Sequence, residues 1–211
     1  MSESSEPPYP DAHWTPPARG GLLRAAVALP FAFLTAFLVA GGLMIHFLLD
    51  PRIGGLRRAA WARTWGRSIL AIFGVKIEIH GLQHHAGPGP AVVLFNHVSL
   101  LDLMVLACLW DEHSNVVHKQ EFHRIPVIGF VMKRMRMIPI DRRDHERAVA
   151  SLALAAAEVR ERGTKVFMAP EGTRSRRGGL QEFKLGPFHL ATATGAPIHP
   201  CLMRGKDHLN P

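Results

Sequence analysis

Apolar and polar positions are distributed in three ways along this chain. Residues 1–19 are polar and rich in proline and serine, without apolar periodicity, which predicts a disordered tail. Residues 25–45 hold no charged side chain. An uncharged run of about 21 residues, at about 1.5 Å per residue, would just cross a hydrocarbon core of about 30 Å. We therefore expect a membrane-inserted helix there. A buried core helix is the alternative, although soluble helices rarely lack a polar face over this length.

Arginines and tryptophans share the next segment, residues 57–73. Four apolar side chains recur at the spacing of one helical face: Trp61, Trp65, Ile69 and Ile72. Tryptophan prefers the headgroup region of a membrane, and arginine pairs with lipid phosphate. The pattern predicts an interfacial helix, so that residues 20–73 would form one membrane-anchoring unit. An amphipathic helix that packs on the following domain is the alternative.

From residue 75 the pattern changes to that of alternating strands and helices. Residues 75–80 alternate between apolar and polar side chains, as a half-buried strand does, and residues 91–95 form a short, wholly apolar strand. Further strands are predicted at residues 115–118, 137–140, 165–168 and 198–203, and helices at residues 100–110, 144–162 and 189–194. We therefore expect an α/β domain over residues 75–211, built on a mixed sheet that helices cover.

Composition narrows the class of protein. Hydrophobic residues make up 47% and charged residues 20% of the chain, which excludes a disordered protein. The net charge of +8 favours a polyanionic partner. Such a partner could be an anionic membrane surface, a phosphorylated substrate or nucleic acid. No nucleic-acid-binding module or aromatic platform is visible, so we expect no nucleic-acid partner. Cys108 and Cys201 lie among apolar neighbours and are predicted to be reduced thiols, in agreement with a domain that faces the cytoplasm.

The first segment with candidate chemistry runs from Asn96 to Asp102 and follows the apolar strand 91–95. A strand end that leads into a helix is where α/β folds usually expose catalytic groups. His97 could act as a general base because histidine titrates near neutral pH, and Asp102 could hold one ring nitrogen and stabilise the imidazolium. Ser99 and Asp102 also have the spacing of a capping-box-like helix start. The two interpretations are compatible.

Three further segments place polar residues at strand ends. In residues 169–175, Gly172 permits a tight turn and Arg174 can clamp a phosphate through two parallel bonds, although a polar surface loop has a similar composition. Residues 140–144 contain Arg142, a candidate contact for an anionic head group, while Asp144 fits the N-cap of the next helix. Residues 195–201 are two proline-bounded turns around a strand and indicate little alone.

In this order and spacing, the four segments resemble the sequence blocks of the glycerolipid acyltransferase family, in particular the 1-acyl-glycerol-3-phosphate acyltransferases. Those blocks read N-H-x-S-x-x-D, then a G-x-x-x-I-D-R-like segment, then F-P-E-G-T-R-S, then a proline-containing apolar strand. The resemblance covers about residues 75–203, and the first block and residues 170–175 match it residue for residue. Three positions depart from the pattern: Arg136 stands at the expected glycine, Pro139 at the usual aromatic residue and Ala169 at the usual phenylalanine.

The resemblance implies a membrane enzyme that transfers a fatty acyl group from acyl-CoA or acyl-carrier protein to the sn-2 hydroxyl of 1-acyl-glycerol-3-phosphate, which gives phosphatidic acid. His97 would be the general base and Asp102 its orienting carboxylate. The acceptor would be bound by Glu171, Gly172, Thr173 and Arg174, with Arg142 and Lys119 as further candidates for its phosphate. No cofactor or metal is implied. The expected location is a bacterial inner membrane, with the catalytic domain on the cytoplasmic side.

Three alternatives differ in what they explain. The acceptor could be another lyso-lipid, such as a lyso-aminolipid. A non-catalytic protein that binds anionic lipids would account for the charge and the apolar run, but not for a histidine–aspartate pair and a Glu-Gly-Thr-Arg loop at two strand ends. A zinc enzyme is disfavoured because the adjacent His84 and His85 occur without an H-E-x-x-H pattern or a cysteine set.

Overall fold

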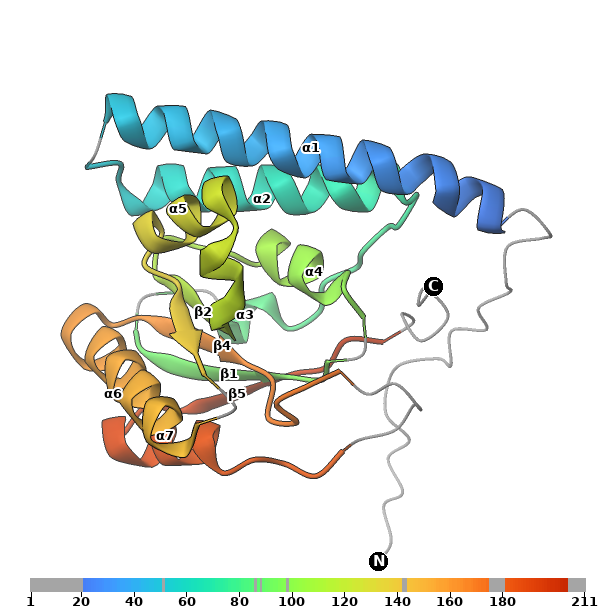
Figure 1. Cartoon of the computed structure of the whole chain (residues 1–211). Helices are drawn as coiled ribbons and strands as arrows, with labels where there is room; N and C mark the ends of the chain where they lie inside the picture. Colours follow the sequence, from blue (N-terminus) through green and yellow to red (C-terminus); the bar gives the residue numbers. More distant parts are fainter. Residues whose placement is uncertain are drawn as a thin grey trace, which may run out of the picture.

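A computed structural model describes residues 21–50, 52–85, 87, 89–97, 99–141, 144–174 and 181–204. The fold is a sheet between two helical layers, with one long helix outside one of these layers (Figure 1). The tail predicted at residues 1–19 lies outside the described residues.

The sheet contains five parallel strands in the order β3-β2-β4-β1-β5. Their bounds are Ala91–Phe95 for β1, Ser114–Lys119 for β2, Ile138–Ile140 for β3, Lys165–Met168 for β4 and Ile198–Cys201 for β5. The α/β class is thus confirmed, but the expected mixed sheet is parallel in all four described pairings. Each connection brings the chain back to the same end of the sheet before the next strand begins, so neighbouring strands run parallel.

Helices cover both faces of this sheet (Figure 1). One face carries α2 (Gly55–Ile72), α4 (Asp102–Cys108) and α5 (Pro126–Arg134), and the other carries α6 (His145–Arg162) and α7 (Gly186–Thr194). A short helix, α3 (Leu82–His85), precedes β1, and a 3-10 turn, η1 (Gln120–Arg124), precedes α5. The ends of α6 follow the sequence prediction, because Asp144 caps it by accepting from the Arg147 backbone nitrogen at 3.1 Å and Gly163 ends it with φ +62°.

The central strands place alternate side chains in two apolar cores. Val93 and Phe167 pack on the side of α2, α4 and α5, whereas Val92 and Val166 pack on the side of α6 and α7. Strands that are covered on both faces carry the continuous apolar runs that the sequence shows. Trp110, which follows α4, stacks on Phe167 with ring centroids 6.2 Å apart. The strands therefore form a rigid support for the loops at their ends.

The segment at residues 75–80 forms no strand, so this prediction was wrong. Its chain turns directly out of α2, because the Val75 backbone nitrogen donates to the Leu70 carbonyl at 2.8 Å. Val75, Ile77 and Ile79 line an apolar cavity beside Leu70 and Cys108. The apolar–polar alternation therefore reflects packing beside a helix rather than a place in the sheet.

Helices α1 (Gly21–Leu49) and α2 lie side by side as an antiparallel hairpin (Figure 1). The buried face of α2 packs on α4, so α2 matches the alternative of an amphipathic helix packed on the domain. Trp61 faces α1, and its Nε1 donates to His46 Nδ1 at 3.1 Å. Contact of α2 with a membrane stays a prediction.

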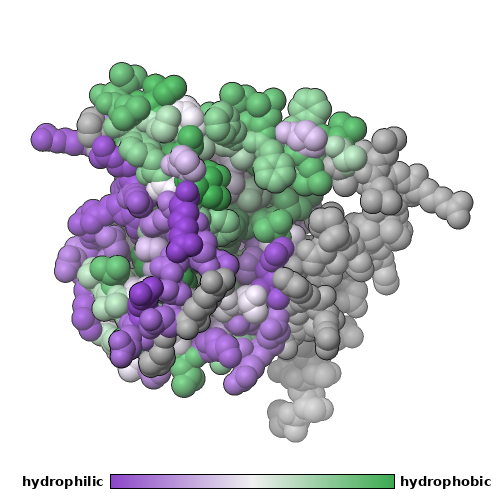
Figure 2. All heavy atoms as spheres, viewed as in Figure 1, coloured by the Kyte–Doolittle hydropathy of each residue, from purple (hydrophilic) through white to green (hydrophobic). Residues whose placement is uncertain are grey.

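The outer surface of α1 is apolar. Its segment Ala26–Leu49 is long and apolar enough to cross a membrane, by length and composition. Large apolar side chains, including Phe33, Phe37 and Leu38, are exposed along it, and Figure 2 shows the apolar surface gathered over this part of the molecule. Exposed apolar surface on this scale is typical of a protein or membrane contact.

Candidate active site

His97 and Asp102 form a close pair at the carboxyl end of β1. His97 Nδ1 and Asp102 Oδ2 are 2.6 Å apart, the Asp102 side chain is fully buried, and the His97 side chain is 19% exposed. With the carboxylate ionised, the proton resides on Nδ1, which donates to Asp102. This tautomer leaves the Nε2 lone pair able to take a proton from a hydroxyl.

A tight turn between β1 and α4 builds this pair. The Ser99 backbone nitrogen donates to Asp102 Oδ2 at 3.0 Å, and the Leu101 backbone nitrogen donates to Ser99 Oγ at 3.2 Å. One carboxylate oxygen is thus fixed by both the turn and the imidazole. The helix-start interpretation and the catalytic interpretation of Ser99 and Asp102 are therefore compatible with the same structure, in which the turn holds the imidazole rigidly.

Glu171 connects the third sequence block to the first. Its side chain is buried, with the residue 2% exposed; Oε1 accepts from the His97 backbone nitrogen at 3.4 Å and Oε2 accepts from the Gln181 backbone nitrogen at 3.0 Å. Strands β1 and β4 are neighbours with Leu94 opposite Met168, so both loops leave the sheet at the same level. Acceptor binding by Glu171 stays a prediction, while its contacts position the backbone of the histidine.

The remainder of the loop after β4 turns back on itself. Gly172 has φ +70°, and its backbone nitrogen donates to the Ala169 carbonyl at 3.0 Å. Glycine adopts this left-handed conformation without steric cost. Thr173 is exposed, and no hydrogen bond or ion pair ties the Arg174 side chain to another described residue. The guanidinium is therefore free of described protein partners and can meet an anion.

Lys119 is a further predicted contact and lies at the same edge of the sheet. Lys119 ends β2 and pairs with Glu121 at 3.1 Å. Strand β4 separates β2 from β1, so the two strands are roughly 10 Å apart at about 4.8 Å per strand. Arg142 lies outside the described residues; Asp141 before it is buried and contacts Arg147 at 3.4 Å. The strand order thus places Lys119 at the same edge as His97, where parallel sheets bind ligands.

Asn96 is a further functional candidate, which sequence reasoning passed over. Its side-chain amide donates to the Met203 carbonyl at 2.9 Å and accepts from the Met203 backbone nitrogen at 2.8 Å. These two bonds tie the segment after β5 to the residue that precedes His97. The position of Asn96 next to the histidine was the only signal in the sequence, because its partner is 107 residues away.

The arrangement suits proton removal from a bound hydroxyl. A thiol nucleophile is not favoured at Cys108, because burial raises the pKa of that thiol and a protonated thiol is a poor nucleophile. The polar groups at this edge instead include one oriented imidazole and, within the loop after β4, the Arg174 guanidinium, which has no described partner. Such a site can deprotonate an alcohol that carries an anionic group nearby.

Comparison with known proteins agrees with this site. The Acyltransferase family matches residues 76–204. The chain is 30% identical to a chloroplastic 1-acyl-sn-glycerol-3-phosphate acyltransferase of Arabidopsis thaliana, over 97% of this chain and 56% of that protein. It is also 30% identical to the 1-acyl-sn-glycerol-3-phosphate acyltransferase of Escherichia coli, over 79% of this chain and 67% of that protein. The chain spans about half the length of the first curated relatives it matches.

A solved structure has the same fold. The crystal structure of the 1-acyl-sn-glycerophosphate acyltransferase PlsC from Thermotoga maritima superposes with a TM-score of 0.72 at 21% identity, over 90% of this chain and 78% of that chain. The family match includes the turn that holds His97 and Asp102 and the loop that holds Glu171. The chain is therefore a member of the acyltransferase family.

Proposed function

We propose that this protein transfers a fatty acyl group from a thioester to the sn-2 hydroxyl of 1-acyl-glycerol-3-phosphate, which gives phosphatidic acid. The observation that carries the proposal is the 2.6 Å contact between His97 and Asp102, at a strand end shared with the Glu171 loop. Both relatives described above are named 1-acyl-sn-glycerol-3-phosphate acyltransferases, which supports this acceptor.

The proposed reaction is a direct transfer. His97 Nε2 takes the hydroxyl proton as the oxygen attacks the thioester carbonyl, and a carbon–oxygen bond forms. The tetrahedral intermediate then collapses, the carbon–sulfur bond breaks, and His97 returns its proton to the leaving thiolate. Asp102 stabilises the imidazolium between these two steps. A general base of this kind contributes about 10²- to 10⁴-fold, and positioning of the two substrates and donors to the oxyanion supply the rest.

Binding of the acceptor phosphate is assigned to the loop after β4. Arg174 offers a planar guanidinium suited to two phosphate oxygens, and Gly172 and Thr173 offer backbone and hydroxyl groups. Arg142 and Lys119 are further candidates for the same phosphate. Glu171 would support this site by holding the loop through the backbone contacts described above, because a buried carboxylate would repel a phosphate in direct contact with it.

Membrane attachment is assigned to α1. Its exposed apolar side chains would enter the bilayer, and the domain beneath would meet the acceptor at the membrane surface. The donor would be acyl-CoA or acyl-carrier protein, and no metal or other cofactor is required by the proposed chemistry. A bacterial inner membrane, with the catalytic domain on the cytoplasmic side, is the proposed location.

The direct test uses the purified full-length protein with labelled acyl-CoA or labelled acyl-carrier protein. Each donor is offered with 1-acyl-glycerol-3-phosphate, a lyso-aminolipid and lysophosphatidylcholine as acceptors. We expect labelled phosphatidic acid from the first acceptor and at least tenfold less product from the other two, since loss of one charge-assisted contact costs about that factor. Equal use of all three acceptors would contradict the assignment of the acceptor. Binding of lipid without any transfer would contradict catalysis itself.

A further inference from the structure

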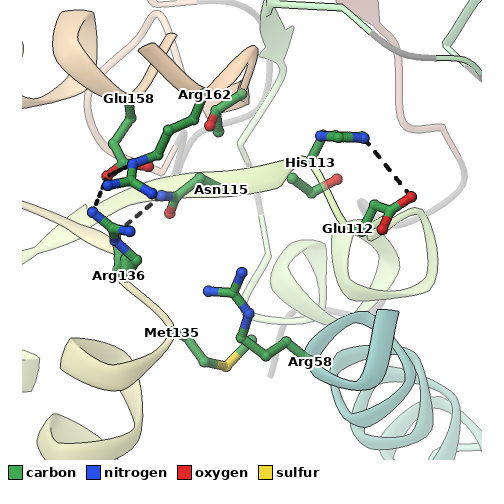
Figure 3. A pocket seen from close by; sticks show the side chains of 10 residues that line it. Arg58, Glu112, His113, Asn115, Met135, Arg136, Glu158 and Arg162 are labelled. Carbon is green, nitrogen blue, oxygen red and sulfur yellow. Dashed lines mark hydrogen bonds and ion pairs between the residues drawn. The ribbon is translucent and has the colours of Figure 1, made fainter. Parts of the chain in front are cut away.

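A basic cavity lies at the end of the sheet opposite to His97, where β2 and β4 begin and close to the start of α2 (Figure 3). It measures about 180 Å³. Arg58 of α2, Arg136 before β3 and Arg162 of α6 line it, together with Asn115 at the start of β2. A strand of five residues, at about 3.3 Å per residue, separates this end of the sheet from the end that holds His97 by roughly 17 Å. The cavity is therefore separate from the candidate active site.

Positive charge exceeds negative charge in this cavity. Glu158 Oε1 forms ion pairs with both Arg136 Nη2, at 3.1 Å, and Arg162 Nε, at 3.3 Å, so one carboxylate is shared by two guanidinium groups (Figure 3). Arg58 Nε is buried and has no hydrogen-bond partner among the residues that the structure describes. Burial and the neighbouring Arg136 lower the pKa of Arg58, although Glu158 partly offsets them. The second carboxylate of the lining, Glu112, lies 3.8 Å from His113 instead.

The backbone at Arg136 gives independent support for a functional cavity. Arg136 has φ +63° and is the one non-glycine residue with positive φ in the described part of the chain. Its carbonyl accepts from Asn115 Nδ2 at 3.0 Å, which holds the turn in place. The resemblance to the acyltransferase blocks predicts glycine at this position, and glycine alone fits this backbone without strain. An arginine that persists in a strained conformation indicates a role for its side chain.

The size of the cavity limits the ligand. Whole cofactors and drug-sized ligands fill pockets of about 300–1,000 Å³, whereas one water takes about 30 Å³ in the liquid. A volume of about 180 Å³ therefore suits a small anion or one charged group of a larger molecule. Guanidinium groups bind the oxygens of phosphate through paired hydrogen bonds, which favours phosphate over a monovalent anion.

We propose that this cavity is a phosphate-binding site, separate from the catalytic histidine. A phosphate here would accept from Arg58 and share Arg136 and Arg162 with Glu158, so that α2, α6 and the turn before β3 are held together. The phosphate can belong to a lipid headgroup or be free in solution. A lipid headgroup is favoured by two exposed apolar side chains that flank the α1–α2 turn, Leu49 (81% exposed) and Leu56 (67% exposed). This preference for lipid rests on the proposed membrane attachment, whereas phosphate binding does not.

The test measures the thermal stability of the purified full-length protein in detergent as inorganic phosphate is added, with sodium chloride at matched ionic strength as reference. Arg58→Gln removes the guanidinium whose Nε is buried, and Arg136→Gly removes a second guanidinium and suits the left-handed backbone. The matched control is Arg57→Gln, which removes an equal charge from the same helix but from an exposed side chain outside the cavity. Arg174→Gln excludes a signal from the proposed acceptor site.

We expect saturable stabilisation by phosphate in the wild type, Arg57→Gln and Arg174→Gln. In Arg58→Gln and Arg136→Gly the phosphate affinity should fall by about tenfold or more, because each loses a charge-assisted hydrogen bond. Equal phosphate affinity in these two variants and the wild type would overturn the proposal. Loss of the phosphate response in Arg174→Gln alone would overturn it as well, because the signal would then come from the other edge of the sheet.

A second measurement distinguishes the two sources of phosphate. Flotation with phosphatidylcholine vesicles, with or without phosphatidate, reports binding to a lipid phosphate. Weaker binding of Arg58→Gln than of Arg57→Gln to the phosphatidate vesicles, with equal binding to the neutral vesicles, assigns the site to a lipid headgroup. Equal binding of these two variants to both kinds of vesicle assigns the site to free phosphate.

Discussion

The side chain of Glu171 contacts the turn that holds His97 and Asp102, with Oε1 3.4 Å from the backbone nitrogen of His97. The second carboxylate oxygen accepts from the Gln181 backbone nitrogen, so both oxygens are occupied by main-chain donors. Two sequence blocks that are 74 residues apart are thereby joined in one unit. The carboxylate is buried, and its hydrogen bonds offset the cost of that burial.

Glu171→Gln is predicted to lower kcat more than it changes KM for the acceptor. The amide keeps the shape of the side chain but replaces one acceptor with a donor, so one backbone nitrogen loses its partner. We expect a loss of about 1–3 kcal/mol in the free energy of unfolding, measured by denaturant titration. The control is Gln181→Ala, which keeps the backbone donor and should behave like the wild type.

Arg174→Gln provides the kinetic contrast to Glu171→Gln. Loss of a charged contact to the acceptor should raise KM by about tenfold or more. If Glu171→Gln raised KM as Arg174→Gln does and left kcat unchanged, Glu171 would be a ligand of the acceptor, and the positioning role would be excluded.

Asp102→Asn is predicted to reduce kcat by about 10³- to 10⁴-fold, on the scale of the loss when the carboxylate behind a histidine base becomes an amide in serine proteases. The amide nitrogen can donate to Nδ1, which then must accept, so that Nε2 carries the proton and cannot take another. Steady-state kinetics at saturating acceptor measure this change, and circular dichroism monitors the fold. A fall in kcat below tenfold would show that Asp102 serves only the helix start.

Much of the site could be predicted from residues that follow strands in the sequence. The apolar runs before His97 and before Glu171 are recognisable as buried strands, and strand ends of a parallel sheet meet at one edge. That β1 and β4 are adjacent strands could not be predicted, because strand order is set by packing between segments that are distant in the sequence. The backbone contacts of Glu171 and Asn96 follow from that order, so they were equally hidden.

Local patterns misled where packing decides the structure. Residues 75–80 alternate like a strand, yet the strands beside β1 are β4 and β5, and the segment packs beside α2 instead. Helix α5 was not predicted, because its run Pro126–Arg134 is short and apolar on most sides, and such runs do not distinguish helix from strand.

Gly66→Ala is predicted to destabilise the protein and to lower activity. A methyl group at Gly66 would lie 2.5 Å from the Met104 carbonyl oxygen and 2.9 Å from Ala107 Cβ, so α2 would be pushed away from α4. Because α4 begins with Asp102, this displacement would reach the proposed catalytic pair, His97 and Asp102. We expect a loss of about 1–3 kcal/mol, although alanine is the better helix former.

Gly41→Ala is the matched control for this substitution. Its methyl group would meet nothing within 4 Å, so only helix propensity changes and the stability should be equal or higher. Chemical denaturation of the two variants measures the difference. Equal stability of Gly66→Ala and Gly41→Ala would contradict the close packing of α2 on α4.

The stability of the protein is predicted to fall below about pH 6.5 partly through His85. Burial and the charge of Lys165 lower the pKa of His85 from its ordinary value of 6.5. Between pH 6.5 and the lowered pKa, His85 therefore binds a proton in the unfolded chain but not in the folded chain. The free energy of unfolding decreases as the pH falls through this range. His85→Gln should reduce this slope in denaturation experiments between neutral and mildly acidic pH. An unchanged slope would contradict the contribution of His85.

The central claim is that His97 is the general base for acyl transfer to a lysophosphatidate hydroxyl. Its most direct test is the rate of labelled phosphatidic acid formation by purified His97→Gln, compared with the wild type at equal amounts of folded, membrane-bound protein. We predict a loss of at least about 10²-fold, the lower end of the contribution of a general base. A variant that still binds membranes and forms phosphatidic acid at near the wild-type rate would contradict the account.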